Sequence, residues 1–441
     1  VTEITGEVSV TLTDRSGQIV ILEDSTEFRE HIDPCVKKKF VTLPEPSLED
    51  QRDDLKRLRD QLELPDHSIT LKEIGKLPEV LRNNDYSTTA VYNDVQILRV
   101  EPGNTEKDNF GLAVDIGTTT VVAYLMDMVS GKKVGVASGL NVQKSYGQDV
   151  ISRINHTMTE ENGLETLHTG IIGQLNELID SLVSKHKIDR TNIYSMTIAG
   201  NSTMMHLAAG IPPKNIAAAP FIPASLEMMR ISAAEMGISI ADQGSIYLLP
   251  GISAYIGADI TAATLASGMA NEEPLSLLID IGTNGEIMLG NKDRLLSCST
   301  AAGPAFEGAT IHDGVGGIAG AINTVSLHDS SLSFTTIADG KPIGICGSGI
   351  VDTLSNLLYA GIIDETGRMV GDGDIESEAG KELAKNLTKF DDQTAYSLAP
   401  SSATAHGDAI LLTQKDVREV QNAKASIAAG ITTLIKTSGK V

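Results

Sequence analysis

The fold is decided by the segment Phe110-Gly-Leu-Ala-Val-Asp115-Ile-Gly117-Thr118-Thr119-Thr120, which has a counterpart in Leu277-Leu-Ile-Asp280-Ile-Gly282-Thr283-Asn284-Gly285-Glu286. Each copy is an apolar strand ending in Asp, a turn of Gly and Thr, and a second strand. Glycine has no Cβ, so the backbone N–H groups and Thr hydroxyls of such a turn can surround phosphate oxygens. Asp115 and Asp280 lie 165 residues apart, which predicts two similar lobes that clamp a nucleotide between them.

The two strand-ending carboxylates are the predicted catalytic groups. Asp115 and Asp280 can each hold a hydrated Mg²⁺ and orient the water that attacks a γ-phosphate. The alternative is that each Asp only caps its turn, and the sequence does not decide which of the two lies nearer the attacking water. The predicted nucleotide contacts in the turns are Gly117, Thr118, Thr119, Gly282, Thr283, Asn284 and Gly285.

Further polar residues are candidates for the site, and most of them allow two interpretations. Gly347-Ser348-Gly349 precede an expected helix, whose N-terminal N–H groups suit a phosphate or ribose, but such a motif is also typical of a close-packed turn. Glu307 lies in a Gly/Pro loop that a nucleotide or partner can approach. Asn201 and Asp259 are interpreted either as helix caps or as cleft residues. His206, on an apolar helix, is interpreted as a core histidine.

Composition excludes several functional classes. With 441 residues, 41% of them hydrophobic, 41 glycines and no Trp, the chain predicts two or three α/β domains. The net charge of −23 opposes binding to nucleic acid without a basic patch. The run Lys37-Lys38-Lys39 is too short for such a patch and is interpreted as a solvated linker.

The three cysteines do not encode a metal site. Cys35, Cys298 and Cys346 form no C-x-x-C pair, so no sequence-local zinc or iron–sulfur site is expected. Few cysteines and no signal peptide indicate the cytoplasm, and no apolar run approaches the roughly 18 residues that span a bilayer. The chain begins with Val1 and stops directly after an expected helix, so we expect a fragment.

Patterning predicts four regions. A hairpin is expected within residues 1–22, and residues 1–42 are assigned to a linker. Residues 43–108 are predicted to form a small α+β domain, with a helix capped by Ser47 and reaching Leu62, a helix over 70–81 and a strand pair over 88–100. Lobe 1 is assigned to 109–274 and lobe 2 to 275–441, incomplete at its C-terminus. Later elements are a strand over 194–200 and helices over 164–187, 204–209, 258–266, 350–360 and 414–436.

The two hairpins resemble the phosphate loops of the ATPases shared by sugar kinases, actin and heat-shock chaperones. That resemblance implies two ribonuclease-H-like α/β lobes, preceded here by the small domain. Longer strings resemble one subfamily, the reductive activators of corrinoid-dependent enzymes. These strings lie at 145–154, 199–206, 302–308, 344–349 and 413–424, and the resemblance covers most of residues 40–441.

The resemblance implies an ATP- and Mg²⁺-dependent activity. In this subfamily, ATP hydrolysis drives the uphill reduction of a Co(II) corrinoid, on a methyl-transferring partner protein, to Co(I). The electron comes from an iron–sulfur module. Residues 1–22 resemble the region after a plant-type ferredoxin, but the cluster cysteines are absent, and the Leu-Ala-Gly-Gly-type adenosine motif is expected only beyond residue 441. We therefore expect a corrinoid protein and a ferredoxin-type donor as partners, with the cluster outside this chain, no nucleic-acid or membrane partner, and a homodimer as one assembly.

Two other functions fit the same scaffold. A small-molecule kinase would need a general base near the γ-phosphate, for which Asp259 is the candidate. An actin-like polymerising protein would need filament contacts, for which the sequence offers no positive sign. The small domain before residue 108 is unnecessary for a simple kinase.

Overall fold

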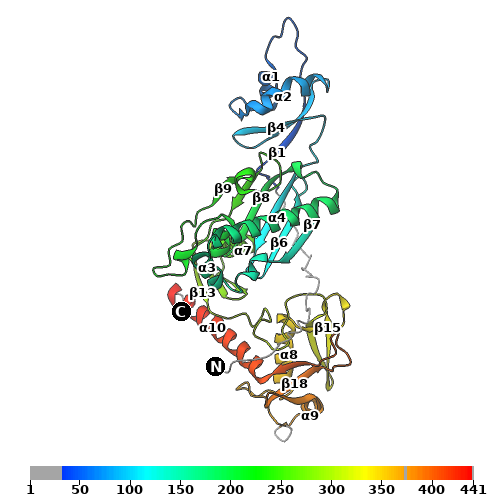
Figure 1. The fold of residues 1–441 in the computed structure, drawn as a ribbon, viewed down its shortest axis with the longest axis vertical. Coiled ribbons are helices and arrows are strands. Elements are labelled where there is room, and N and C mark those ends of the chain that lie inside the picture. Colours follow the sequence, from blue (N-terminus) through cyan, green and yellow to red (C-terminus); the bar gives the residue numbers. More distant parts are fainter. Residues whose placement is uncertain (1–31, 372–374, 440–441) are drawn as a thin grey trace. The chain divides into compact units, whose positions relative to one another are not determined.

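The computed structural model describes residues 32–371 and 375–439 (Figure 1). Contacts divide the chain after Gly268 into two compact units, which are described one at a time. The expected boundary between the lobes lay between residues 274 and 275. The hairpin expected within residues 1–22 lies outside the described residues.

The first unit begins with a small α+β domain. Its four strands are ordered β1-β3-β4-β2 and two helices cover them, burying Leu58, Leu77 and Ile97. The predicted strand pair and second helix are confirmed. The elements are β1 (Lys37–Thr42), α1 (Asp54–Leu62), β2 (Ser68–Ile69), α2 (Leu71–Arg82), β3 (Ser87–Tyr92) and β4 (Gln96–Pro102).

The predicted start of the first helix is wrong. Helix α1 begins at Asp54, and Asp53 caps it by accepting a hydrogen bond from the Lys56 N–H group. Ser47 instead closes a short turn, because its hydroxyl accepts from the backbone N–H groups of Glu49 and Asp50. Ser and Asp are comparable caps, so the sequence alone could not choose between the two positions.

The interpretation of Lys37–Lys39 as a solvated linker is also wrong. These residues form β1, which pairs with β3, and strand alternation turns Lys38 inward. The Lys38 side chain is 1% exposed and its Nζ atom lies 2.8 Å from Glu101 Oε2. Glu101 also accepts a 2.6 Å hydrogen bond from the Tyr194 hydroxyl. The Tyr194 hydroxyl therefore joins this buried ion pair of the small domain to the sheet that follows.

That sheet has six strands in the order β7-β6-β5-β8-β10-β9. Strands β5 to β7 are antiparallel neighbours, whereas β8 runs parallel to β5 and β10 parallel to β8, which is a ribonuclease-H-like arrangement. The strand predicted over 194–200 is confirmed. The strands are β5 (Phe110–Ile116), β6 (Thr120–Asp127), β7 (Lys133–Leu140), β8 (Ile193–Gly200), β9 (Met229–Ser232) and β10 (Ser245–Leu248).

Helix α4 crosses one face of this sheet (Figure 1). Its apolar residues, among them Leu175 and Ile179, share one buried core with Leu112, Val114 and Ile116 of β5. The helices predicted over 164–187, 204–209 and 258–266 are confirmed as α4 (Gly163–His186), α5 (Ser202–Ala208) and α7 (Ala258–Ser267). The unit also contains α3 (Val150–Thr159), α6 (Ala233–Met236) and a 3-10 turn η1 (Val142–Ser145) after β7.

The described part of the second unit contains three sheets of three strands each. The first is the hairpin sheet β11 (Ser276–Ile281), β12 (Gly285–Asn291) and β13 (Arg294–Thr300). The others are β14 (Ala321–His328), β15 (Ser331–Thr336) and β16 (Gly344–Ile345), and β17 (Leu387–Phe390), β18 (Gln393–Ala399) and β19 (Ile410–Thr413).

Three helices accompany these sheets. They are α8 (Gly347–Tyr359), α9 (Glu378–Leu383) and α10 (Gln414–Ser438), so the helices predicted after residue 349 and over 414–436 are confirmed. Thr413 and Asp416 form a capping box at the start of α10. The predicted α/β class is confirmed. No helix in the described residues is long and apolar enough to cross a membrane.

Candidate functional site

The first predicted turn joins β5 to β6. Gly117 donates its N–H group to the Thr120 carbonyl at 2.9 Å, which closes the hairpin. A Cβ atom on Gly117 would lie 2.7 Å from that same oxygen, so only glycine fits here. The predicted strand–turn–strand structure is confirmed for this copy.

Groups from other elements hold the carbonyls of this turn from one side. Asn141 donates its Nδ2 to Gly117 O at 2.8 Å and its backbone N–H to Thr119 O at 2.9 Å. The Arg153 guanidinium donates to Thr118 O. In a trans peptide the C=O and the next N–H point in opposite directions. The N–H groups of Thr118 and Thr119 therefore face away from Asn141 and Arg153, as an anion-binding turn requires.

Arg153 is a functional candidate that the sequence analysis missed. Its side chain is fully buried, and burial lowers its pKa to about 10, so it remains protonated at neutral pH. Nε donates to Gly147 O at 2.9 Å, and Nη1 lies 3.1 Å from the Met204 sulfur. The only available signal was its place in the string 145–154 that carries the family resemblance.

Asn201 combines the two roles left open by the sequence. Its Oδ1 accepts from the Met204 N–H group at 3.0 Å, which caps α5, and its Nδ2 donates to Thr118 Oγ1 at 3.0 Å. The cap and the contact with the predicted phosphate turn thus belong to one side chain. Asn201 follows β8 directly, so β8 positions it beside the turn that follows β5.

His206 is a satisfied core histidine, as predicted. Its Nδ1 bonds to Ser202 O at 2.7 Å, and its Nε2 accepts from the Ala224 N–H group at 3.1 Å. Burial lowers its pKa. The ring is therefore neutral at pH 7 and connects α5 to the loop that follows it.

Two carboxylates approach the same end of the sheet. Asp115 is exposed at the end of β5, on the face opposite the buried Leu112, Val114 and Ile116. Asp259 lies in the first turn of α7, but Gly257 occupies the cap position, so the N-cap interpretation of Asp259 is wrong. A Cβ on Gly257 would lie 2.4 Å from the Cα of Asn201, which brings the start of α7 against the Asn201 turn.

The second predicted turn joins β11 to β12 and contacts a carboxylate. Gly282 donates its N–H to Asn284 O at 3.0 Å, so the predicted hairpin is confirmed here too. The Thr283 hydroxyl donates to Glu307 Oε2 at 2.7 Å, and a Cβ on Gly282 would lie 3.4 Å from Glu307 Oε1. The structure therefore brings Glu307 onto the turn formed by Gly282 and Thr283.

Acidic side chains surround this second turn. Asp280 pairs in register with Glu286 across the hairpin, so the two side chains leave the sheet on the same face. Partial desolvation raises the pKa of Asp280, although its exposed side chain keeps the carboxylate in contact with water. Together with Glu307 these groups suit a hydrated cation better than a bare phosphate.

Packing accounts for the other predicted glycines. A Cβ on Gly285 would lie 2.7 Å from Thr300 Oγ1, and Cβ atoms on Gly347 and Gly349 would lie 2.1 and 2.2 Å from the carbonyl oxygens of Phe306 and Ile322. Ser348 donates its hydroxyl to Asn323 O at 2.6 Å. The close-packed-turn interpretation therefore explains the motif at 347–349, and its nucleotide contacts stay predictions.

The described residues offer few ligands to a metal ion or cluster. Within residues 32–371 and 375–439, no group of three or more His, Cys, Asp or Glu side chains could hold a metal ion. A Mg²⁺ ion at either turn would therefore take most of its ligands from water and phosphate, which is common for this ion. Cys35 is exposed, Cys298 half-buried and Cys346 buried, so these three thiols do not fit an iron–sulfur cluster.

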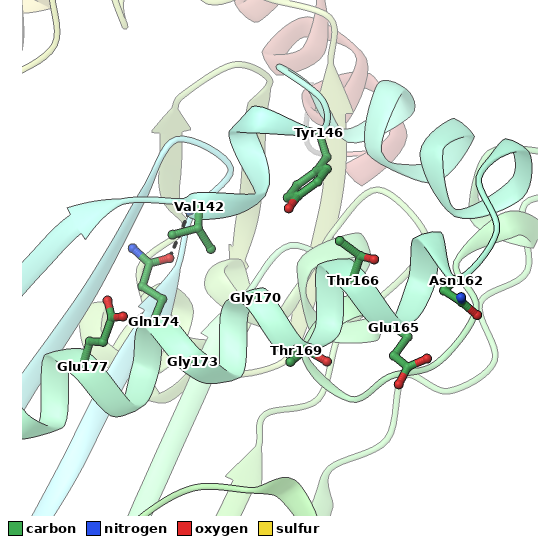
Figure 2. Close-up of a pocket in the computed structure, with 10 residues that line it drawn as sticks. All are labelled: Val142, Tyr146, Asn162, Glu165, Thr166, Thr169, Gly170, Gly173, Gln174 and Glu177. Atoms are coloured by element: carbon green, nitrogen blue, oxygen red, sulfur yellow. Dashed lines mark hydrogen bonds between the residues drawn. The ribbon is translucent and has the colours of Figure 1, made fainter.

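A cavity of about 670 Å³ lies elsewhere on the first unit, between η1 and the N-terminal half of α4 (Figure 2). Gly170 and Gly173 form part of its floor, Tyr146 stands on one side, and Gln174 accepts from the Val142 N–H at 3.1 Å. None of the residues predicted to bind nucleotide lines this cavity.

Comparison with known proteins agrees with this architecture. The chain matches the RACo linker region over residues 27–107, the RACo middle region over 110–272, and the C-terminal domain of RACo, described as the ASKHA domain, over 274–441. A solved structure titled as the reductive activator for a corrinoid, iron–sulfur protein superposes with a TM-score of 0.83 at 36% identity. That match covers 94% of this chain and 66% of the other.

Two curated proteins are similar in sequence. The corrinoid activation enzyme RamQ of Eubacterium limosum is 34% identical over 427 residues, covering 95% of this chain and 70% of RamQ. The Co(II) methylated amine-specific corrinoid protein reductase of Methanosarcina barkeri is 27% identical over 361 residues, covering 75% and 60%. The chain thus spans about two thirds of the length of the relatives that it matches.

Proposed function

The chain belongs to the RACo family of reductive activators of corrinoid proteins, and from that premise we propose that it couples ATP hydrolysis to the reduction of a Co(II) corrinoid to Co(I). Support comes from relatives whose names state corrinoid activation or corrinoid reduction. These names describe corrinoid activation or reduction and not phosphoryl transfer to a small molecule, so the small-molecule kinase is not favoured. The partner is then a corrinoid protein of a methyltransferase system.

One structural observation carries the ATPase part of the proposal. The carbonyls of Gly117, Thr118 and Thr119 are all bonded from one side, by Asn141 and Arg153. The opposite side of the turn therefore presents N–H groups, which is the arrangement that binds phosphate oxygens. The Thr118 hydroxyl beside Asn201 adds a further polar contact on this turn.

The two turns are assigned different tasks. The first turn binds and orients the phosphates of ATP through its N–H groups, and Asp115 lies beside it. Asp280 and Glu307 at the second turn would hold hydrated Mg²⁺, which would neutralise charge on the phosphates. Whether Asp115 or Asp280 orients the attacking water stays a prediction to be tested, as does the action of both turns on one nucleotide.

In this proposal, the electron that reduces Co(II) does not come from a group held by this chain. Because the three cysteines of this chain do not form a cluster site, we assign no electron-transfer step to its own residues. A ferredoxin-type iron–sulfur donor supplies the electron in this proposal. A cytoplasmic location and a homodimer remain predictions from the sequence.

The test measures the oxidation state of the cobalt. The protein is mixed with a Co(II) corrinoid protein and a reduced ferredoxin, and the conversion to Co(I) is followed by absorbance with ATP, with ADP and with a non-hydrolysable ATP analogue. Of these three nucleotides, we expect only ATP to give fast formation of Co(I). Equal rates in all three conditions would refute energy coupling. Phosphate appearing on a small-molecule acceptor instead of free in solution would favour the kinase.

A further inference from the structure

Arg153 differs from the other buried basic side chains of the first unit in the groups that it contacts. Arg57 is also buried, and its Nη1 lies 2.6 Å from the Asp50 carboxylate. Lys38 pairs with Glu101 at 2.8 Å. Within the described residues Arg153 forms no ion pair, and Asp149 attracts it only from a longer distance. Burying an unpaired charge destabilises a fold, so this cation calls for an explanation.

All of its hydrogen-bond partners are neutral. The guanidinium donates to the carbonyls of Gly147 and Thr118 and approaches Gln143 Oε1 at 3.4 Å and the Met204 sulfur. Its planar fork thus connects the loop before α3 to the middle carbonyl of the first turn. A point charge such as lysine could not bind both carbonyls in the same geometry.

The position of Arg153 has an electrostatic consequence for the open side of the turn. Its charge lies directly behind the Thr118–Thr119 peptide, whose N–H end points the other way. The peptide dipole and the cation therefore both make the open side positive. In a chain of net charge −23, an anionic ligand needs such a local field to approach.

We propose that Arg153 is a positioning residue for the phosphates of ATP. It fixes the Thr118–Thr119 peptide so that its N–H faces the nucleotide, and it supplies positive charge behind that peptide without touching the ligand. The inference rests on the proposed ATPase function. It deepens that function by naming the group that selects ligands by their phosphate charge.

The experiment compares ligands of increasing charge on the whole chain. Binding of adenosine, MgADP and MgATP is measured by calorimetry for wild type, Arg153→Met and Arg153→Lys. With Arg153→Met we expect MgATP affinity to fall roughly tenfold or more. The Coulomb energy between two unit charges about 10 Å apart at moderate dielectric corresponds to a change of that order. The loss should be smaller for MgADP and absent for adenosine. Arg153→Lys keeps the charge and should keep the order of affinities, with a smaller overall loss.

Arg57→Met is the matched control, because it removes a buried arginine from the small domain. It should leave the affinities for all three ligands unchanged. A uniform loss across the three ligands in Arg153→Met would mean a purely structural role and overturn the inference. If Arg153→Met does not fold, the folded Arg153→Lys variant is used instead. If its affinities for MgATP, MgADP and adenosine no longer follow the wild-type order, the inference is likewise overturned. Failure of the wild type to bind MgATP would instead refute the proposed function itself.

Discussion

The two turns of this protein share a sequence motif but not an environment. Strand β5 lies between β6 and β8, whereas β11 pairs only with β12 in the part of the chain that the structure describes. Leu112, three residues before Asp115, is 4% exposed, and its counterpart Leu277 is 42% exposed. The motif therefore determines the hairpin, while the neighbouring strand determines how much of it is buried.

The charges at the two turns differ as well. Arg153 bonds to the first turn from behind, and Glu307 accepts from Thr283 of the second. A cation behind a turn favours phosphate, whereas a carboxylate beside it favours a hydrated divalent cation. The two copies of one motif thus suit different ligands, phosphate at the first turn and a hydrated cation at the second.

The strongest test of this division replaces the two aspartates. Asp115→Asn and Asp280→Asn should each lower the ATP hydrolysis rate by roughly 10²–10³-fold, since each removes a carboxylate assigned to hold hydrated Mg²⁺ or to orient the attacking water. Only Asp280→Asn should also raise the Mg²⁺ concentration needed for half-maximal rate. Steady-state phosphate release at varied Mg²⁺ measures both effects. If one variant keeps full activity, the two turns do not act on one nucleotide.

The next test addresses burial with a matched pair of leucines. Leu112→Ala should destabilise the first unit by about 2–4 kcal/mol, because it empties a packed position. Leu277→Ala should cost the second unit less than about 1 kcal/mol, because much of that side chain already contacts water. Hydrogen exchange of peptides covering each hairpin reports the two units separately. Equal costs would mean that β11 is covered as well as β5.

A smaller effect is expected from the carboxylate at the second turn. Glu307→Gln should weaken Mg²⁺-dependent activity about tenfold, and it should tighten the binding of ATP without Mg²⁺, because a negative charge near the phosphates is removed. Glu273→Gln, which neutralises an exposed carboxylate of the same unit that pairs with Lys292, is the control. An identical response of both variants would mean that the effect comes from the net charge and not from the position of Glu307.

The sequence predicted the local structure well because that structure depends on local chemistry. The Gly117 turn, the long helix α4 and the capped helix α10 follow from glycine geometry, apolar periodicity and a capping box. Thr118 and Thr283 were assigned to glycine turns that join two strands, and both lie in such turns. Their contacts with nucleotide stay predictions.

The errors and omissions involve contacts between segments distant in sequence. Lys38 was taken for a solvated residue because its partner Glu101 is 63 residues away. Arg153 was missed because the carbonyl that it binds, Thr118, is 35 residues away. Glu307 was a loop residue until folding placed it on Thr283. Single-residue patterns do not contain such pairings, so only three-dimensional structure supplies them.

The smallest expected effect is a pH dependence confined to the first unit. Burial lowers the pKa of His206 below its ordinary 6.5, so on acidification the unfolded chain takes up this proton before the folded chain does. Stability should therefore be highest above about pH 6.5 and fall towards the lowered folded pKa, by at most about 1.4 kcal/mol per pH unit. Hydrogen exchange of the α5 peptides at several pH values measures the slope. His206→Gln, which cannot be protonated, should flatten it, with second-unit peptides as the internal reference. An unchanged slope would mean that another group titrates.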